Sequence, residues 1–411
     1  MLARAKGVHY WTPEGRKIID GTAGLWCVNA GHGREEIKAA IAKQLDEMDY
    51  APSFQMGHPK AFELAARHAA PAAGRPQPRL LLQLRLRGRR LSAQDRARLS
   101  PRQRRGHAHA LRRPRARLSR RRLRRHLRSA AWSTTANGSA PCCRASITCR
   151  TPIWRRTPSP RASPSTACEL ADALERIVGL HDASNIAAVI VEPCAGSTGY
   201  LPPPKGYLER LRQICDKHGI LLIFDEVITG FGRLGTAFAA DKFGVIPDLM
   251  TVAKGISNAT VPMGGVFVRK PVFDGLMNGP ENAIDLFHGY TYSAHPLACA
   301  AASAVLDIYR DENLFERSAE LSPYWEDGVH SLKGLPNVTD IRNLGLAAGI
   351  DLAPQGPVGT RGYEAFTKAF ELGLMVRQSG DAIAMSPPLV IEKAQIDEII
   401  DITAKTIKAV A

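Results

Sequence analysis

Residues 220–235 read ILLIFDEVITGFGRLG, and residues 248–258 read DLMTVAKGISN. In each stretch an apolar run ends directly at a charged residue, at Asp225 in the first and at Lys254 in the second. Short, continuous apolar runs are typical of strands buried in a parallel sheet. Ligands of open α/β sheets bind outside the carboxyl ends of the strands, so the two stretches predict a ligand site at one sheet edge.

An acid and a lysine at one sheet edge suit the cofactor pyridoxal phosphate. Its aldehyde bonds covalently to a lysine amine, and its pyridine nitrogen needs a carboxylate that keeps it protonated so that the ring can draw electrons. We therefore expect Lys254 and Asp225 to take these two roles. Either residue alone would more ordinarily be a solvated or capping charge, so the interpretation depends on the surrounding sequence.

Both stretches resemble the class III aminotransferases, and in particular their ω-amino acid:pyruvate (β-alanine:pyruvate) branch. The resemblance extends over DGTAGLWCVNAGHG (20–33), AAVIVEPCAGSTGYLPPPKGYLERLRQICDKHG (187–219), HGYTYSAHPLACAAA (288–302) and GLMVRQSGDAIAMSPPL (373–389). It implies an α/β protein of fold type I, in which a large domain holds a doubly wound, mainly parallel sheet and a small α/β domain follows at the C-terminal end.

The hydrophobic pattern fits this domain organisation. A third apolar run, Ile186–Val191, precedes a stretch with helical spacing, Gly206–His218, which Gly219 ends. Alternating strands and helices favour a parallel sheet, and from about Ile308 the pattern changes to helices with short strands, ending in Lys393–Val410. The expected divisions are an N-terminal segment shared with the small domain (1–66), an aberrant Arg-rich segment (67–167), the cofactor-binding large domain (168–305) and the small domain (306–411).

The resemblance assigns two polar residues to recognition. It places Thr291 on the cofactor phosphate of a neighbouring subunit, and so implies a homodimer or homotetramer with shared active sites. It places Arg377 where ω-amino acid transaminases bind the substrate carboxylate, which a planar guanidinium holds through two hydrogen bonds. The alternatives are a loop threonine of ordinary β propensity and a solvated surface arginine.

Five further positions bear on the site. The resemblance places Trp26 in the wall of the substrate pocket, although a core tryptophan would look the same in the sequence. It places Glu192 near the cofactor ring or in a structural role at its strand end, and Val227 at the cofactor. Ornithine-type relatives carry an arginine where this chain has Ala384 and an acid where it has Ser197. Both departures favour the pyruvate-linked ω-amino acid branch.

Composition excludes several protein classes. With 411 residues, 45% of them hydrophobic, the chain can bury a large core. No apolar run reaches the roughly 18 residues that a membrane-spanning helix needs. The start, MLARAKGVHYW, lacks the apolar segment of a secretory signal, and the eight cysteines lack zinc-type spacing. We therefore expect a cytoplasmic enzyme with reduced thiols and no metal.

The formal charge of +16 arises in one segment. Between Arg75 and Arg161 there are 26 arginines, no lysine and a single acid, so the rest of the chain is net acidic. Residues 68–167 also lack sustained helical or strand periodicity. A disordered basic insert that binds RNA is one interpretation, but only Trp132 and Trp154 are available there for base stacking.

A frameshift is the other interpretation, because arginine without lysine is typical of a GC-rich gene read out of frame. With suitable synonymous codons, one shifted frame over residues 81–88 gives FFNSGSE, the phosphate-loop sequence of the resembled family. The same frame at residues 118–120 gives part of AYHGVGFGG, its cofactor-stacking motif, and the other frame re-reads residues 140–151 as ALLPGVDHLPH. We therefore hypothesise compensating frameshifts near residues 67–78, 129 and 166.

The expected reaction is transamination in two halves. An ω-amino acid such as β-alanine, or a related amine, gives its amino group to the cofactor, and pyruvate then receives it. A broader amine:pyruvate transaminase is a rival of the same class. Because the phosphate loop and the stacking aromatic fall in the scrambled segment, an inactive pseudoenzyme is a second rival, and an Arg-rich nucleic-acid-binding protein is a third.

The frameshift hypothesis predicts the outcome of sequencing the gene. Insertions or deletions are expected near codons 67–78, 129 and 166, and restoring the frame should raise cofactor affinity and transaminase activity together, because phosphate anchoring and ring stacking act on the same bound cofactor. A DNA sequence that confirms this chain, and whose other frames do not encode the two motifs, would reject the hypothesis.

Overall fold

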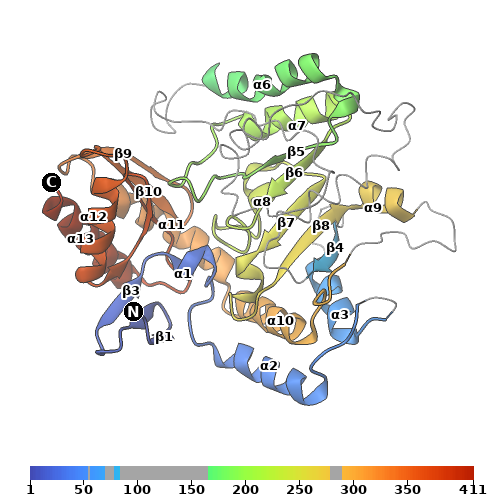
Figure 1. The fold of residues 1–411 in the computed structure, drawn as a ribbon, viewed down its shortest axis with the longest axis horizontal. Helices are drawn as coiled ribbons and strands as arrows, with labels where there is room; N and C mark the ends of the chain where they lie inside the picture. Colours follow the sequence, from blue (N-terminus) through green and yellow to red (C-terminus); the bar gives the residue numbers. More distant parts are fainter. Residues whose placement is uncertain (54–55, 70–77, 84–164, 278–288) are drawn as a thin grey trace, which may run out of the picture.

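The computed structural model describes residues 1–53, 56–69, 78–83, 165–277 and 289–411. These ranges form a larger part around a five-stranded sheet and a smaller part that contains the C-terminus, with the N-terminal strands beside the smaller part (Figure 1). Most of the scrambled segment lies outside the described residues, including residues 84–88 of the re-read phosphate loop and the whole re-read stacking motif. Among the described helices, none is both long and apolar enough to cross a bilayer.

The large sheet has the strand order β4-β8-β7-β6-β5. Its strands are β4 (Pro78–Gln83), β5 (Ala188–Val191), β6 (Leu221–Asp225), β7 (Leu249–Ala253) and β8 (Gly264–Arg269). β5, β6 and β7 pair in parallel, and β8 pairs antiparallel with both β7 and β4. Of these five strands only β8 runs the opposite way, so the expected mainly parallel α/β sheet is confirmed.

Helices cover both faces of this sheet. On β6, Phe224 faces the core under α6 (Ser165–His181) and α7 (Tyr207–His218), while Ile223 faces the core that contains Val272 of α9 (Lys270–Met277). This alternation follows from the two-residue period of a strand. α7 forms as its pattern predicts: its apolar residues are buried, and Gly219 ends it in the left-handed conformation with φ 66°.

Strand β4 corrects one expectation. It lies within residues 68–167, where the sequence shows no sustained periodicity, yet its backbone pairs with β8 over six residues from Pro78 to Gln83. Pairing at a sheet edge depends on backbone N–H and C=O groups, which carry no hydrophobic pattern. Pro78 is tolerated there because it is the first residue of an edge strand.

The smaller part contains a four-stranded antiparallel sheet of order β12-β13-β10-β9. Its strands are β9 (Val338–Asn343), β10 (Ala348–Leu352), β12 (Arg377–Ser379) and β13 (Ala382–Met385), and its helices are α11 (Leu314–His330), α12 (Thr360–Glu371) and α13 (Lys393–Ala409). α13 forms where its isoleucine stripe predicts, with Ile396, Ile399 and Ile407 buried.

The N-terminal strands join the C-terminal half of the chain. β1 (Arg4–Lys6), β2 (His9–Trp11) and β3 (Lys17–Asp20) form a sheet that β11 (Leu374–Met375) completes in parallel with β3. α1 (Ala23–Trp26), α2 (Glu35–Glu47) and α3 (Pro59–Ala69) then lead the chain towards the large sheet. The N-terminal segment therefore touches both parts of the molecule.

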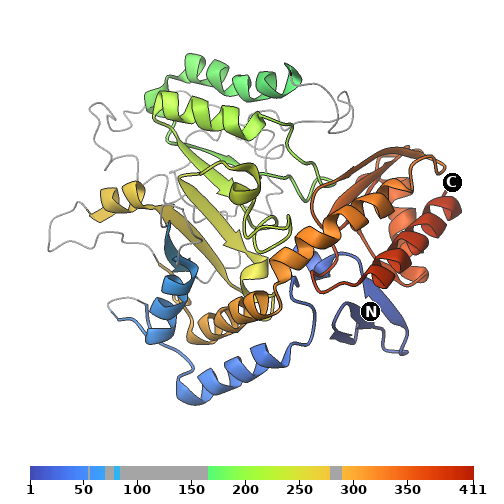
Figure 2. The ribbon, with the colours of Figure 1, turned by 180° about the vertical axis from the view of Figure 1, so that it is seen from behind.

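α10 (Pro296–Asp311) carries the chain between the two parts. Seen from behind, α10 and α11 run one after the other from the large sheet towards the smaller part (Figure 2). The expected domain boundary at residues 305 and 306 falls inside α10, because a change of hydrophobic pattern does not reveal a helix that continues across it.

Two buried arginines connect the parts from opposite sides. Arg233, fully buried in the large part, donates hydrogen bonds to the carbonyl oxygens of Leu346 (3.0 Å) and Pro387 (2.6 Å) and to the side-chain oxygen of Asn29 (3.0 Å). Burial lowers the pKa of Arg233 to about 10, which leaves it charged at neutral pH. Arg342 of β9 donates in return to carbonyl oxygens of the large part at Gly199 and Tyr200.

Replacing Arg233 tests its role as a brace between the two parts. Arg233→Met should lower the free energy of unfolding by about 3 kcal/mol, because it leaves several buried acceptors without donors. Arg310→Met is the control, since Arg310 is an exposed residue in surface ion pairs and should change stability little. Urea denaturation of both variants measures the difference, and equal stability of the two would contradict this role.

Candidate active site

Three chemically useful residues follow three neighbouring parallel strands. Glu192 comes directly after β5, Asp225 is the last residue of β6, and Lys254 comes directly after β7. The parallel register pairs Val191 with Phe224, and Asp225 with Thr251. The three residues therefore lie along the same carboxyl edge of the sheet, which is where open α/β sheets bind ligands.

Asp225 is held at this edge as a buried carboxylate. It is 5% exposed, and its Oδ1 accepts a hydrogen bond from the backbone N–H of Val227 at 3.3 Å. The next residue has a structural role, because the carboxylate of Glu226 accepts bonds from Thr229, Ala239 and Ala240. Glu226 thus caps the start of α8 (Ala239–Phe243), and its burial raises its pKa to about 7.

Lys254 has an unusual backbone. Its φ of 54° lies in the left-handed region, which a side-chain-bearing residue rarely adopts, and it begins the short 3-10 helix η3 (Lys254–Ser257). Strained positions of this kind cluster at functional sites. Burial raises the pKa of the Cys27 thiol, and the positive charge of Lys254 acts in the opposite direction. Lys254 therefore lies near Cys27 of the N-terminal segment.

Glu192 takes part in the local structure at the end of β5. Its Oε2 accepts a hydrogen bond from the backbone N–H of Gly196 at 3.2 Å. This contact closes the first turn of the loop after β5. Val227 lies two residues beyond Asp225, and its backbone N–H bonds to the Asp225 carboxylate, so it lies at the same edge of the sheet. Its side chain is half-buried.

Trp26 lies in an apolar cluster where the N-terminal segment meets both parts. It is 3% exposed and stacks on Tyr200, with ring centroids 5.7 Å apart and an interplanar angle of 18°. Ile228, from the turn after Asp225, and Ala384, from β13, belong to the same cluster. The indole therefore lies between the carboxyl edge of the large sheet and the small sheet.

Arg377 shares a face with this cluster. It lies on β12 directly opposite Ala384 of β13, and directly opposite residues of an antiparallel pair point to the same face. Because Ala384 packs in the cluster with Trp26, that face of the small sheet is turned towards the indole. The structure thus brings Arg377 to the side of the small sheet that faces the large domain.

Thr291 lies elsewhere on the molecular surface. It is exposed, and its carbonyl oxygen accepts a hydrogen bond from the hydroxyl of Tyr50 at 2.9 Å. The neighbouring Tyr292 is also exposed, and its ring lies 6.1 Å from that of His295 at the start of α10.

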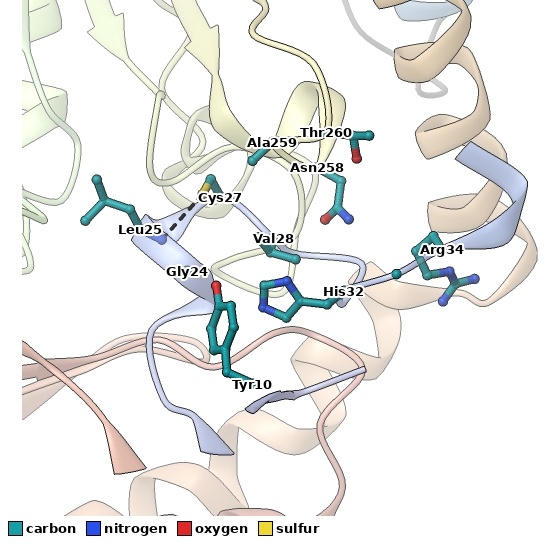
Figure 3. Close-up of a pocket in the computed structure, with 11 residues that line it drawn as sticks. Tyr10, Gly24, Leu25, Cys27, Val28, His32, Arg34, Asn258, Ala259 and Thr260 are labelled. Carbon is teal, nitrogen blue, oxygen red and sulfur yellow. Dashed lines mark hydrogen bonds between the residues drawn. The ribbon is translucent and has the colours of Figure 1, made fainter. Parts of the chain in front are cut away.

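A cavity of about 460 Å³ opens between the N-terminal segment and the residues that follow η3 (Figure 3). Its lining comes from the chain around Trp26 and from the residues just after η3; it comprises Tyr10, Gly24, Leu25, Cys27, Val28, His32, Gly33, Arg34, Asn258, Ala259 and Thr260. The rings of Tyr10 and His32 lie side by side in it, with centroids 4.4 Å apart. The volume suits a small molecule, but Asp225, Lys254 and Arg377 are not among the lining residues.

The sequence did not predict three side chains that shape this region. Tyr200 supports Trp26 and donates a hydrogen bond from its hydroxyl to the carbonyl oxygen of Leu344 at 2.6 Å. Ile228 packs in the same cluster, and Arg342 binds the loop that carries Tyr200. Their contacts join distant parts of the chain, so no local pattern signals them, although the loop motif CAGSTGY was already part of the recognised resemblance.

Comparison with known proteins gives a consistent result. The family model described as aminotransferase class-III matches residues 138–407. An ω-aminotransferase of Caulobacter vibrioides is 48% identical, over 98% of this chain and 92% of the relative. A β-alanine–pyruvate aminotransferase of Pseudomonas aeruginosa is 42% identical, over 100% of this chain and 92% of the relative.

Solved structures agree with the sequence relatives. A thermostable (S)-enantioselective ω-transaminase from Thermomicrobium roseum has a TM-score of 0.85 and 29% identity, covering 100% of this chain and 92% of that one. An ω-transaminase from Pseudomonas jessenii, solved in complex with PMP, has a TM-score of 0.85 and 26% identity, with the same coverage.

The sheet edge fits the reactive part of pyridoxal phosphate. Asp225 offers a buried carboxylate for the ring nitrogen, and Lys254 offers an amine from the neighbouring strand. Residues 84–88 of the re-read phosphate loop, and the whole re-read stacking motif, fall outside the described residues. On its family match, its relatives and this arrangement of residues, the chain belongs to the class III aminotransferases, and its cofactor is pyridoxal phosphate.

Proposed function

We propose that this aminotransferase moves the amino group of an ω-amino acid, such as β-alanine, to pyruvate. The relatives named for ω-amino acid and β-alanine transamination support this substrate class, since they match almost the whole chain. A putrescine–pyruvate aminotransferase is also similar, at 33% identity, so a carboxylate-free donor is the main competing substrate class.

The position of Arg377 is the observation that favours an ω-amino acid over a carboxylate-free amine as the donor. A donor with a distal carboxylate needs a cation at a fixed distance from the reacting amine, and a guanidinium binds a carboxylate through two parallel hydrogen bonds. Arg377 lies on the face of the small sheet that packs against Trp26, across from the edge that holds Asp225. Carboxylate recognition and amine chemistry then come from the two parts of the molecule.

The catalytic roles follow from the chemistry of the two edge residues. When bound, pyridoxal phosphate supplies an electron-withdrawing ring that takes the amino group from one substrate and gives it to the next. The carboxylate of Asp225 would hold the ring nitrogen and keep it protonated. The Nζ of Lys254 would hold the cofactor through its aldehyde and, as a free amine, would carry a proton to and from the substrate carbon that bears the amino group. Trp26 would form one wall of the substrate pocket, and Val227 would help to hold the cofactor.

We further propose that a second copy of the chain completes each site. Thr291 is exposed, and a hydroxyl at this position suits a phosphate oxygen of the partner's cofactor. Several exposed apolar side chains lie on the elements around it, and burial against a second copy would remove them from water. They are Tyr50, Met56, Phe62 and Tyr292. On this proposal residues 1–66 bridge the large (168–305) and small (306–411) domains, α10 continues across the boundary between the two, and the enzyme is cytoplasmic.

The lysine assignment has a direct chemical test. If the full chain is incubated with pyridoxal phosphate and reduced with borohydride, the cofactor should become fixed to Lys254, because Lys254 and Asp225 follow neighbouring strands at the same sheet edge. Peptide mapping by mass spectrometry identifies the labelled residue. Lys205, a surface lysine of the large part, is the internal control and should stay unlabelled; a label on any other lysine would reject the assignment.

The carboxylate site is tested by Arg377→Ala. This change should cost about 2–4 kcal/mol in kcat/KM for β-alanine, because a substrate carboxylate would lose its buried cationic partner. The rate with an amine that lacks a carboxylate should fall much less. Steady-state kinetics with both donors measure the two effects.

Gln378→Ala is the matched control for this experiment. Gln378 is the next residue of β12, so its side chain points to the opposite face, where its amide donates hydrogen bonds to Gly359 and Gly380. It should leave the preference for carboxylate donors unchanged. Equal losses for both donors in Arg377→Ala would remove Arg377 from substrate recognition.

A further inference from the structure

The loop of residues 192–201, here called the spacer loop, lies between the two halves of the proposed site. On the side of the large sheet, Glu192 accepts a hydrogen bond from Gly196, and Gly196 packs closely on Ile228 in the turn after Asp225. A Cβ at Gly196 would lie 2.5 Å from the Cδ1 of Ile228, so this end of the loop touches the Asp225 turn without a gap.

The other end of the spacer loop is fixed to the small sheet. The hydroxyl of Ser379 on β12 donates to the carbonyl oxygen of Ser197 at 3.2 Å. Arg342 on β9 donates from Nη2 to the carbonyl oxygen of Gly199 at 2.7 Å and from Nε to that of Tyr200 at 2.9 Å. The same guanidinium pairs with Asp340 and Asp351, which hold it in place.

The register of the small sheet connects this anchor to the proposed carboxylate site. Arg342 is opposite Gly349, Gly349 is opposite Ala384, and Ala384 is opposite Arg377. The four residues form one row across β9, β10, β13 and β12, and their positions all face the same side of the sheet. An arginine stands at each end of the row, and the two smallest residue types stand between them.

The small residues let the spacer loop rest on the sheet itself. A Cβ at Gly349 would lie only 2.0 Å from the carbonyl oxygen of Gly199, so the loop backbone occupies the space that any other side chain would fill. Ala384 provides the next place in the row and packs with Trp26 and Tyr200. The thickness of the loop therefore sets how far the small sheet stands from the edge that holds Asp225.

We propose that the spacer loop fixes the length of ω-amino acid that the enzyme accepts, with Gly349 and Arg342 as positioning residues. This inference rests on the proposed function, because it takes Arg377 as the anchor of the substrate carboxylate. One end of the substrate is held from the small sheet and the other reacts at the large sheet, so the distance between them selects the number of carbons. The loop backbone touches both the Asp225 turn, at Gly196, and the row of Arg377, at Gly199.

Gly349→Ala changes this distance with one added carbon. Real Cβ atoms essentially never lie within 3.0 Å of a backbone oxygen, so the loop and the sheet must separate by about 1 Å, close to the length that one methylene adds to an extended chain. The preference should therefore shift from three-carbon towards four- and five-carbon ω-amino acids. Since one methylene in a fitted pocket changes selectivity by at least about 10-fold, a shift of that order in relative kcat/KM is expected.

Gly362→Ala is the matched control. A Cβ at Gly362 would meet the carbonyl oxygen of Gly380 at 2.1 Å, an equal degree of crowding in the same part of the molecule, but in α12 and not against the spacer loop. Both variants should lower the melting temperature, and only Gly349→Ala should alter the chain-length profile.

Arg342→Lys is the second test, because it keeps the positive charge but loses hydrogen-bond donors to the spacer loop. It should broaden the range of chain lengths that the enzyme accepts. This variant takes the place of Gly349→Ala if Gly349→Ala does not fold.

The measurement uses 3-aminopropanoate, 4-aminobutanoate and 5-aminopentanoate with the full chain. Relative kcat/KM is determined with cofactor, and dissociation constants are determined by calorimetry without it, so that the result does not require turnover. An unchanged profile in Gly349→Ala, or an equal shift in Gly362→Ala, would overturn the inference. If Arg377→Ala selectively lowers kcat/KM for carboxylate donors while Gly349→Ala leaves the chain-length profile unchanged, only the role of the spacer loop is rejected. If Arg377→Ala lowers kcat/KM equally for donors with and without a carboxylate, the proposed function itself is rejected.

Discussion

The parallel pairing of β6 with β7 is the constraint on which the rest of the structure depends. It brings Asp225 and Lys254 to the same edge of the sheet although 28 residues separate them in the chain, and it does so with backbone hydrogen bonds that do not depend on the identity of either side chain. The left-handed backbone of Lys254 then turns the chain sharply at the end of β7. A cofactor that requires both an amine and a carboxylate finds them on adjacent strands.

The second half of the site comes from a different part of the chain and needs a rigid connection. Two buried guanidinium groups, of Arg233 and Arg342, cross the boundary in opposite directions, and each binds two backbone carbonyl oxygens of the other part. Carbonyl acceptors are fixed by the fold, so these bonds hold the two parts at one separation. The spacer loop lies between the two parts. Because a substrate that reaches from Arg377 to the Asp225 edge must span their separation, this distance selects the length of the substrate.

The sequence predicts some of these features and not others, for physical reasons. The strands that end at Asp225 and Lys254 are continuous apolar runs because both faces are buried, and α7 carries its own end signal in Gly219. Strand β4 is missed, since edge pairing uses only backbone groups. The stacking of Trp26 on Tyr200 and the row from Arg342 to Arg377 are also missed, because strand register and contacts between distant segments are set by the packing of the whole fold.

The most direct test of the account is a crystal structure of the full chain with pyridoxal phosphate bound. The cofactor should lie at the carboxyl edge of β6 and β7, with its aldehyde carbon bonded to Nζ of Lys254 and its ring nitrogen within about 2.7–2.9 Å of the Asp225 carboxylate. The guanidinium of Arg377 should face the same space from the small sheet. A cofactor held by another lysine, or seated in the cavity beside Tyr10 and His32 without contact to Asp225, would contradict it.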